Sequence, residues 1–137
     1  MTENAHSVTV ETVSGVTIFK ARGALKLGEP VLDELRRRCC DLGARGIDRL
    51  VLDLEHVSAI DSSGIGVLLQ AYTSLRNRGG HCKLLKLAPR LAEVLRVVGL
   101  LAVFEVYDDR NAVLASFEQS SPQETKGRVA GGPERAA

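Results

Sequence analysis

Two neighbouring hydroxyls, those of Ser62 and Ser63, are the side chains of this sequence best placed for chemistry. They follow a branched apolar segment that starts at Leu50 and precede a second apolar segment that starts at Ile65. This order predicts a strand that hands over to a helix at the serines. The first N–H groups of a helix lack partners within it, and the helix dipole is positive there, so an anionic group is stabilised. A phosphate added to either serine would lie at that spot.

The run Asp61-Ser62-Ser63-Gly64 also has an ordinary structural explanation. Asp and Ser are favoured at the N-cap of a helix, and Gly relieves crowding where the chain enters a helix tightly. A functional role requires that the serines be exposed at the carboxyl end of a central strand, where open α/β sheets place their sites. The local sequence favours capping, and the position in the fold decides whether a function is added.

The sequence around the serines argues against a hydrolase. In the G-x-S-x-G motif a glycine stands two positions before the nucleophile, but Ile60 and Asp61 occupy those positions here. His81 is the only downstream histidine that could serve as a base.

Other catalytic patterns are weak as well. The pair Gly64 and Gly66 is a bare Gly-x-Gly without the G-x-x-x-x-G-K-[ST] motif, so a nucleotide pocket stays open but unsupported. Paired carboxylates occur only as Asp53 with Glu55 and as Asp108 with Asp109. The first pair lies in or just after an expected strand and the second at an expected helix cap, so neither pair looks catalytic. We therefore predict that this protein is not an enzyme.

Composition limits the partners. The chain has 137 residues, with 18 Lys plus Arg against 17 Asp plus Glu, and its net charge of +1 gives no field toward nucleic acid or a membrane. Aromatic residues make up 4 %, which leaves few rings for stacking bases. The N-terminus lacks the regions of a signal peptide, and no apolar run of about 18 residues occurs, so we expect a cytoplasmic protein.

Cysteine and histidine do not suggest a metal site or a disulfide. The three cysteines leave an odd thiol, and the adjacent pair Cys39-Cys40 lacks C-x-x-C spacing, so all three are expected to be reduced. Only His81-Cys82 brings two soft ligands together. We expect no metal and no cofactor.

The hydrophobic pattern predicts alternating elements after an N-terminal hairpin. The hairpin joins strands 7–13 and 16–22 through the turn Ser14-Gly15. A helix that opens at Pro30 should bury Val31, Leu35, Cys39 and Leu42, end at Gly43 to Gly46, and expose a salt-bridged face with Asp33–Arg37 and Glu34–Arg38 pairs rather than a nucleic-acid patch. The remaining expected elements are a central strand 49–54, a helix from about 63 to 78, a strand 82–87, a helix from Pro89 to Gly99, a strand 103–106, and a helix capped by Asp108 that runs to Phe117.

This order predicts an α/β fold with one domain, residues 7–118, and a central mixed, mostly parallel sheet with about four helices. Residues 1–6 are expected to be a flexible N-terminus. The tail 119–137 has Pro, Gly and charge but almost no bulky apolar residue, so it is expected to be disordered.

The linked motifs resemble the STAS family over residues 7 to about 118, and within it the bacterial anti-sigma factor antagonists. The pieces that carry the resemblance are Gly23-x-Leu25, the strand 51–54, the run Asp61-Ser62-Ser63-Gly64-Ile65-Gly66, the strand 84–87 leading to Pro89, and Val98-Gly99-Leu100 ahead of 104–107. Together they are specific, whereas the D-S-S-G run alone is only moderately so.

The resemblance implies a phosphorylation switch at Ser62, with Ser63 keeping a capping role. The unmodified protein would bind an anti-sigma factor that is also a serine kinase and so release a sigma factor; phosphorylation would end that contact, and a serine phosphatase would reverse it. The implied partner surface comprises the loop 57–61, the first turns of the following helix and the loop 23–27. Its named residues are Gly23, Lys26, Val57, Asp61, Ser62, Ser63, Gly64 and Ile65.

Lys26 departs from the family pattern, because many relatives have an acidic residue just after the Gly-x-Leu motif. A lysine near Ser62 could pair with the phosphate, mark a subgroup with another kinase, or simply be solvated. Lys26→Asp should alter phosphorylation or partner affinity if the lysine acts on the switch.

Three alternatives remain within the same resemblance. The chain could be a STAS scaffold in a signalling complex whose serine only caps a helix, and self-association is open in that case. It could be a separate subunit that modulates an anion transporter, which the lack of a membrane span disfavours. It could also be a nucleotide-binding module, which a direct nucleotide titration would decide.

Overall fold

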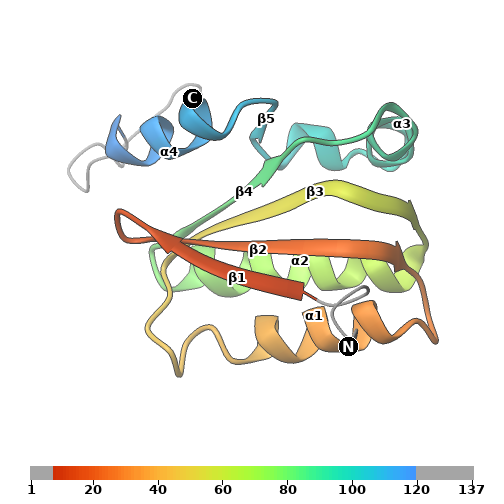
Figure 1. Cartoon of the computed structure of the whole chain (residues 1–137), viewed down its shortest axis with the longest axis horizontal. Helices are drawn as coiled ribbons and strands as arrows, with labels where there is room; N and C mark the ends of the chain where they lie inside the picture. The colour runs from red at the N-terminus through yellow and green to blue at the C-terminus, as the bar shows by residue number, and fades with distance from the viewer. Residues whose placement is uncertain (1–7, 120–137) are drawn as a thin grey trace.

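The computed structural model describes residues 8–119, arranged as a mixed sheet between two layers of helices (Figure 1). The expected flexible N-terminus and disordered tail lie outside the described residues, except Gln119, which ends the last helix rather than starting the tail. The elements in chain order are β1 (Val8–Val13), β2 (Val16–Leu25), α1 (Pro30–Cys40), β3 (Arg49–Ile60), α2 (Ser62–Asn77), β4 (His81–Leu85), α3 (Pro89–Val97), the 3₁₀ helix η2 (Leu100–Ala102), β5 (Val106–Tyr107) and α4 (Arg110–Gln119).

The strands follow one another across the sheet in the order β1-β2-β3-β4-β5, so β3 is central as expected. β1 and β2 pair antiparallel, and the other three neighbouring pairs are parallel. The hairpin turn has positive φ at both central residues, 52° at Ser14 and 82° at Gly15, as a type I′ turn requires. The predicted α/β fold class, with its mixed sheet and four helices, is confirmed.

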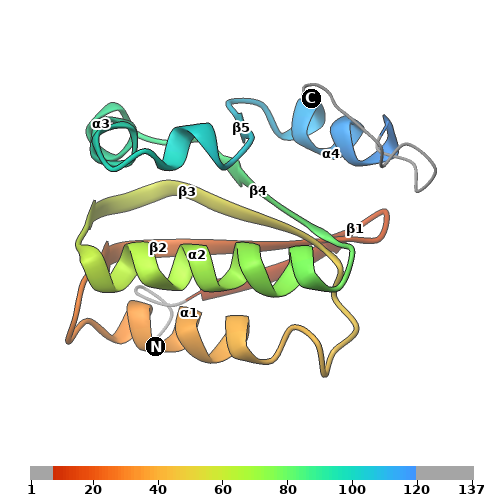
Figure 2. The same ribbon diagram turned by 180° about the vertical axis from the view of Figure 1, so that it is seen from behind.

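Alternate residues of the strands face two different cores. On one face Phe19, Leu52 and Leu84 join the large core that α1 and α2 complete, and on the other Ile18, Val51 and Leu85 pack with α4. The two helices α1 and α2 lie together on one side of the sheet, and α3 and α4 lie on the other (Figure 2). β3 is therefore covered on both faces, which explains its unbroken apolar run.

A buried lysine anchors α4 to the sheet. The Nζ of Lys83, in β4, donates to Ser116 Oγ at 2.9 Å, lies 3.3 Å from Glu105 Oε1, and sits 4.4 Å from the centroid of the Phe117 ring. The side chain of Lys83 is only 3 % exposed, and its burial lowers the pKa of the ammonium group. Lys83 and Leu85 share one face of β4, because residues two apart in a strand point the same way. The sequence predicted the strand but not this buried contact of the lysine.

Two strands are longer than the sequence predicts. β2 continues to Leu25 and β3 to Ile60, and these last residues pair with each other. The register shifts between Gly23 and Ala24, where Gly23 adopts φ of 120°, a value that only glycine reaches easily. The expected loops 23–27 and 57–61 are therefore mostly strand, because the bulge lets pairing pass the glycine.

The C-terminal part differs more from the prediction. β4 ends at Leu85, because Lys86 has φ of 62°. The expected strand 103–106 is wrong: the last strand is Val106–Tyr107, and Phe104 instead packs its ring against Tyr72 with centroids 5.1 Å apart.

Three further expectations, about helix termini and surface pairs, are corrected. α4 is capped by Asp109, whose Oδ2 accepts from the Ala112 N–H at 2.8 Å, and not by Asp108. α1 ends at Cys40, before the two glycines, although Leu42 is buried as predicted. The Glu34–Arg38 pair is confirmed at 3.2 Å. Asp33 pairs with Arg36 at 3.2 Å instead of with Arg37, because three residues along a helix also face each other.

Candidate functional site

The carboxyl ends of β2 and β3 lie side by side and bring two distant loops together. The Asp61 N–H donates to the Leu25 carbonyl at 3.3 Å, which continues the pairing one residue beyond the strands. The run that begins at Asp61 therefore meets the loop that follows Leu25 at the edge where α/β sheets place their sites.

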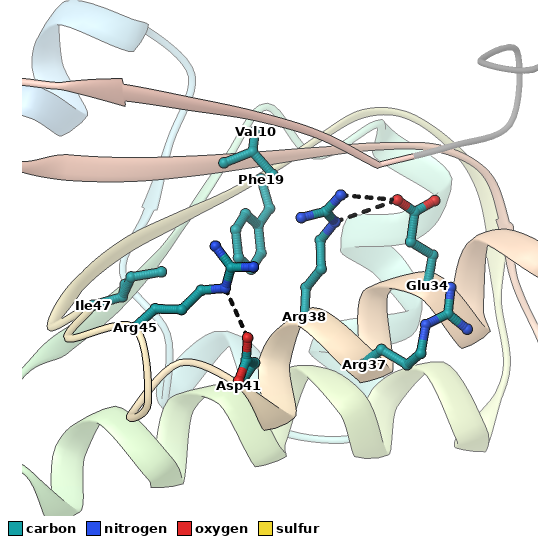
Figure 3. A pocket seen from close by; sticks show the side chains of 8 residues that line it. All are labelled: Val10, Phe19, Glu34, Arg37, Arg38, Asp41, Arg45 and Ile47. Carbon is teal, nitrogen blue, oxygen red and sulfur yellow. Dashed lines mark hydrogen bonds and ion pairs between the residues drawn. The ribbon is translucent and has the colours of Figure 1, made fainter.

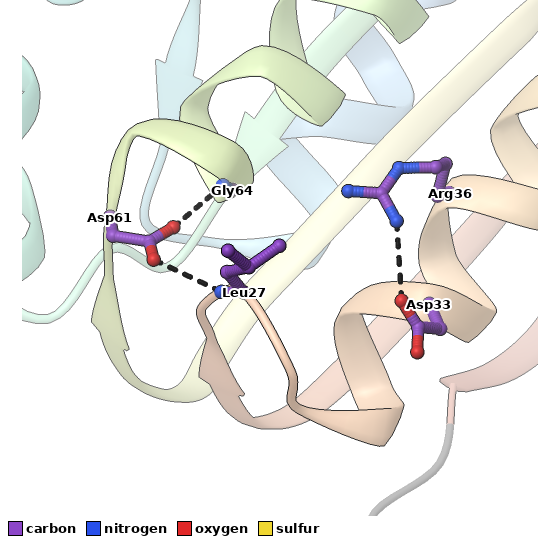
Figure 4. Close-up of polar contacts among 5 residues, drawn as sticks. All are labelled: Leu27, Asp33, Arg36, Asp61 and Gly64. Carbon is purple, nitrogen blue, oxygen red and sulfur yellow. Dashed lines mark hydrogen bonds and ion pairs between the residues drawn. The ribbon is translucent and has the colours of Figure 1, made fainter.

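Asp61 is the N-cap of α2 and also binds the neighbouring loop. Its Oδ1 accepts from the Ser63 N–H at 2.9 Å. The same Oδ1 accepts from the Gly64 N–H at 3.1 Å, and Oδ2 accepts from the Leu27 N–H at 3.0 Å (Figure 4). The Leu27 N–H above all, and then the helix N–H groups and Lys26, hold the pKa of Asp61 below its usual value. One carboxylate thus joins two segments that are 34 residues apart.

Gly64 allows this close approach. A Cβ at this position would lie 2.2 Å from the Leu25 carbonyl oxygen and 2.6 Å from Ile60 Cγ1. Only a residue without a side chain lets α2 start directly against the ends of β2 and β3. The glycine of the D-S-S-G run is therefore a packing requirement of the site.

The two serines are not equivalent in the structure. Ser62 is the first residue of α2 and is exposed, whereas Ser63 is half-buried. The expectation that Ser63 caps the helix is wrong. Asp61 has the extended backbone of an N-cap residue, and its carboxylate accepts from the Ser63 and Gly64 N–H groups. The exposed hydroxyl is the one that the sequence proposed as phosphate acceptor.

The other residues predicted for the partner surface divide by exposure. Lys26 is exposed and contributes to the electrostatics of Asp61. Gly23 and Ile65 are half-buried, and Val57 is 3 % exposed and belongs to the large core. A side-chain contact with a partner therefore fits Lys26 and Ser62 and does not fit Val57.

Leu27 lies in the loop 23–27 of the predicted partner surface, but the sequence did not single it out as a contact residue. Its side chain is 74 % exposed, the most exposed large apolar side chain in the described part of the chain. Its backbone N–H is the group bound by Asp61 Oδ2, so this exposed apolar side chain stands on a loop that is tied to the residue just before Ser62 (Figure 4). The signal was available, because Leu27 follows the Gly-x-Leu motif and fits no helix or strand pattern.

A separate hollow of about 260 Å³ lies between the hairpin and α1 (Figure 3). Arg38 pairs there with Glu34, and Arg45 pairs with Asp41 at 2.7 Å. The lining residues are Val10, Phe19, Glu34, Arg37, Arg38, Asp41, Arg45 and Ile47. None of them belongs to the predicted site, so this hollow does not add to it.

Two kinds of feature are absent from residues 8–119. No group of three or more His, Cys, Asp or Glu side chains there could hold a metal ion. None of the helices in that range combines the length and apolar character of a membrane span.

Comparison with known proteins gives a consistent result. The family profile described as STAS domain matches residues 7–113. The protein BtrV of Bordetella bronchiseptica is 28 % identical over 116 residues, which are 85 % of this chain and 98 % of BtrV. The anti-sigma F factor antagonist of Paenibacillus polymyxa is 27 % identical over 112 residues, 81 % of this chain and 94 % of the relative. The Bacillus cell fate determinant SpoIIAA in its phosphorylated form has the same fold, with a TM-score of 0.65 at 20 % identity over 80 % of this chain and 98 % of SpoIIAA.

Proposed function

We propose that this chain, which belongs to the STAS domain family, is an anti-sigma factor antagonist switched by phosphorylation of Ser62. The unmodified chain binds an anti-sigma factor and so frees a sigma factor for transcription. The phosphorylated chain no longer binds. The protein acts by binding in the cytoplasm and catalyses no reaction of its own.

The observation that carries the proposal is the exposed Ser62 at the first position of α2, after the central strand. A phosphate adds a charge of about −1.5 to −2 and three acceptor oxygens. The N-terminus of α2 tolerates that charge, whereas an interface that fits the bare hydroxyl does not. The fold therefore survives phosphorylation while the contact is lost.

The names of the relatives support the type of partner. One relative is an anti-sigma F factor antagonist, and one structural neighbour was solved in a phosphorylated form. We infer for this chain a partner that is both anti-sigma factor and serine kinase, and a serine phosphatase that restores the hydroxyl. The positive charge of Lys26 helps to lower the pKa of Asp61. Lys26 is therefore the basic residue that we expect to pair with the phosphate.

Intact-mass measurement after incubation with ATP and a candidate kinase tests the switch. We expect wild type and Ser63→Ala to gain one phosphoryl group and Ser62→Ala to gain none. The Ser63→Ala variant is the matched control, because it removes the adjacent hydroxyl and leaves the Asp61 cap intact. A gain that persists in Ser62→Ala would place the switch elsewhere.

Affinity capture from the source lysate tests the partner. Wild type and Ser62→Asp are compared side by side, and the retained proteins are identified by mass spectrometry. We expect an anti-sigma factor to be retained by wild type and lost with Ser62→Asp. Equal retention by both forms would favour a scaffold that phosphorylation does not control.

A further inference from the structure

We propose that Leu27 is the apolar side chain with which this protein holds the anti-sigma factor, and that a phosphate on Ser62 releases Leu27 by taking the helix N–H groups that now bind Asp61. This inference rests on the proposed function and adds a contact residue and a route from the phosphate to it. The partner surface that it implies is an apolar recess next to the position of Ser62.

Leu27 suits such a contact because it is exposed and its backbone is held. The side chain is 74 % exposed, while Leu25, two residues earlier, is completely buried and fixes the start of the loop. The bond from the Leu27 N–H to Asp61 Oδ2 fixes the loop on its other side. A loop whose backbone is already held loses little conformational entropy on binding, which favours affinity.

The carboxylate of Asp61 and a phosphate on Ser62 would compete for the same donors. Asp61 Oδ1 accepts from the Ser63 and Gly64 N–H groups, the two residues that follow Ser62 at the start of α2. Phosphate oxygens are strong acceptors for such N–H groups, and two adjacent anions repel each other. The carboxylate therefore swings away from the helix, and the Leu27 N–H loses its acceptor.

Amide hydrogen exchange measured by NMR tests the route without a kinase or a partner. Phosphoserine is incorporated at position 62 during synthesis of the full chain, and at position 14 as the control. Ser14 is exposed in the hairpin turn, at the opposite end of β2 from Leu25. With phosphoserine at 62 we expect the Leu27 amide to exchange at least about tenfold faster, while the Ser63 and Gly64 amides stay protected by the phosphate.

The variant with phosphoserine at position 14 is the control for this measurement. Phosphoserine at 14 should leave the Leu27 amide unchanged. If phosphoserine at 62 also leaves Leu27 unchanged, the release of the loop is wrong.

Titration of the purified anti-sigma factor tests the contact. Leu27→Asp and the milder Leu27→Ser should each bind at least about tenfold more weakly than wild type. Val97→Asp is the matched control, because Val97 is 71 % exposed but lies on α3, on the other side of the sheet. Circular dichroism of all variants checks that each one is folded.

The outcomes separate this inference from the proposed function. If phosphoserine at 62 leaves binding as tight as in the unmodified chain, the proposed switch fails whatever Leu27 does. If it abolishes binding while Leu27→Asp and Leu27→Ser bind like wild type, the switch stands and the role of Leu27 is wrong.

Discussion

Two strand-to-helix junctions in this molecule use an aspartate cap, and they differ in how far the cap reaches. Asp109 at the start of α4 accepts one N–H group, from Ala112, three residues along the chain. Asp61 at the start of α2 accepts two helix N–H groups and also the N–H of Leu27 from another loop. The first cap is local, whereas the second holds a tertiary contact at the candidate site.

The two junctions are also attached to the sheet by different means. At β3–α2 the backbone itself packs closely, with Gly64 against the Leu25 carbonyl. Helix α4 is held by apolar packing of Val113 and Phe117 and by a side-chain network, in which Lys83 of β4 reaches Ser116 and Glu105. A close backbone contact tolerates no added atom. A side chain in a polar network, in contrast, can be replaced by another side chain of similar shape.

The largest effect that we expect comes from adding one methyl group to α2. Gly64→Ala should lower the free energy of unfolding by about 3 kcal/mol, because the new Cβ would overlap backbone that cannot move freely. Gly66→Ala should raise it by up to about 1 kcal/mol, since that position has open space and alanine favours helix. Urea unfolding measures both variants, and equal values would contradict a backbone contact at Gly64.

A smaller effect separates the two caps. Asp109→Ala should cost about 1 kcal/mol of unfolding free energy, as for an ordinary N-cap. Asp61→Ala should lower Tm further than Asp109→Ala, because it also removes the acceptor of the Leu27 N–H. Thermal unfolding followed by circular dichroism compares them, and an equal or smaller fall for Asp61→Ala would mean that its contact with Leu27 adds no stability.

The pH dependence of stability reports the same contact. The pKa of Asp61 is lowered, first by the Leu27 N–H, so its stabilising contribution is complete above the usual aspartate pKa and is lost as pH falls through the lower folded value. The Tm difference between wild type and Asp61→Asn should therefore be largest near neutral pH and shrink as the pH falls below the usual aspartate pKa. A difference that stays constant over this range would show that the charge of Asp61 is not involved.

The smallest effect is expected at the buried lysine. Lys83→Met keeps the shape of the side chain and removes a buried charge, and Glu105 is 58 % exposed and can be solvated. The unfolding free energy should change by less than about 1 kcal/mol in either direction. Lys83→Ala is the control that also removes packing against Phe117, and it should be clearly destabilising. A large loss in Lys83→Met would show that the network, rather than shape, holds α4.

The strongly periodic parts of the fold were predictable from the sequence. The hairpin, the buried face of α1 and the central strand followed from apolar spacing and from turn and cap residues. The last strand was not, because Val103 and Phe104 have strand propensity, but Val103 ends the 3₁₀ helix with a bond to the Leu100 carbonyl and Phe104 is held by a tertiary contact. Phe104 is buried against Tyr72, and only the short segment Val106–Tyr107 pairs with β4.

The candidate site shows the same division. Residue types and spacing predicted the cap-forming run with its two serines, because these are local properties of a helix start, and the resemblance to the STAS family selected Ser62. It could not place Leu27 against Asp61, since that bond joins residues 34 positions apart and depends on the parallel pairing of β2 with β3. Burial of Val57 was equally invisible, because a β-branched residue near a strand end suits either environment.

The sequence by itself determined most of the element types, the α/β order and the cap-forming run with its two serines, since each depends on neighbours within one or two turns. The tertiary structure decided that the carboxylate of Asp61, besides capping α2, also holds the loop that carries an exposed leucine. The physical reason is that a hydrogen-bond acceptor serves whichever N–H groups lie nearest in space. Only the folded chain brings the Leu27 N–H to Asp61.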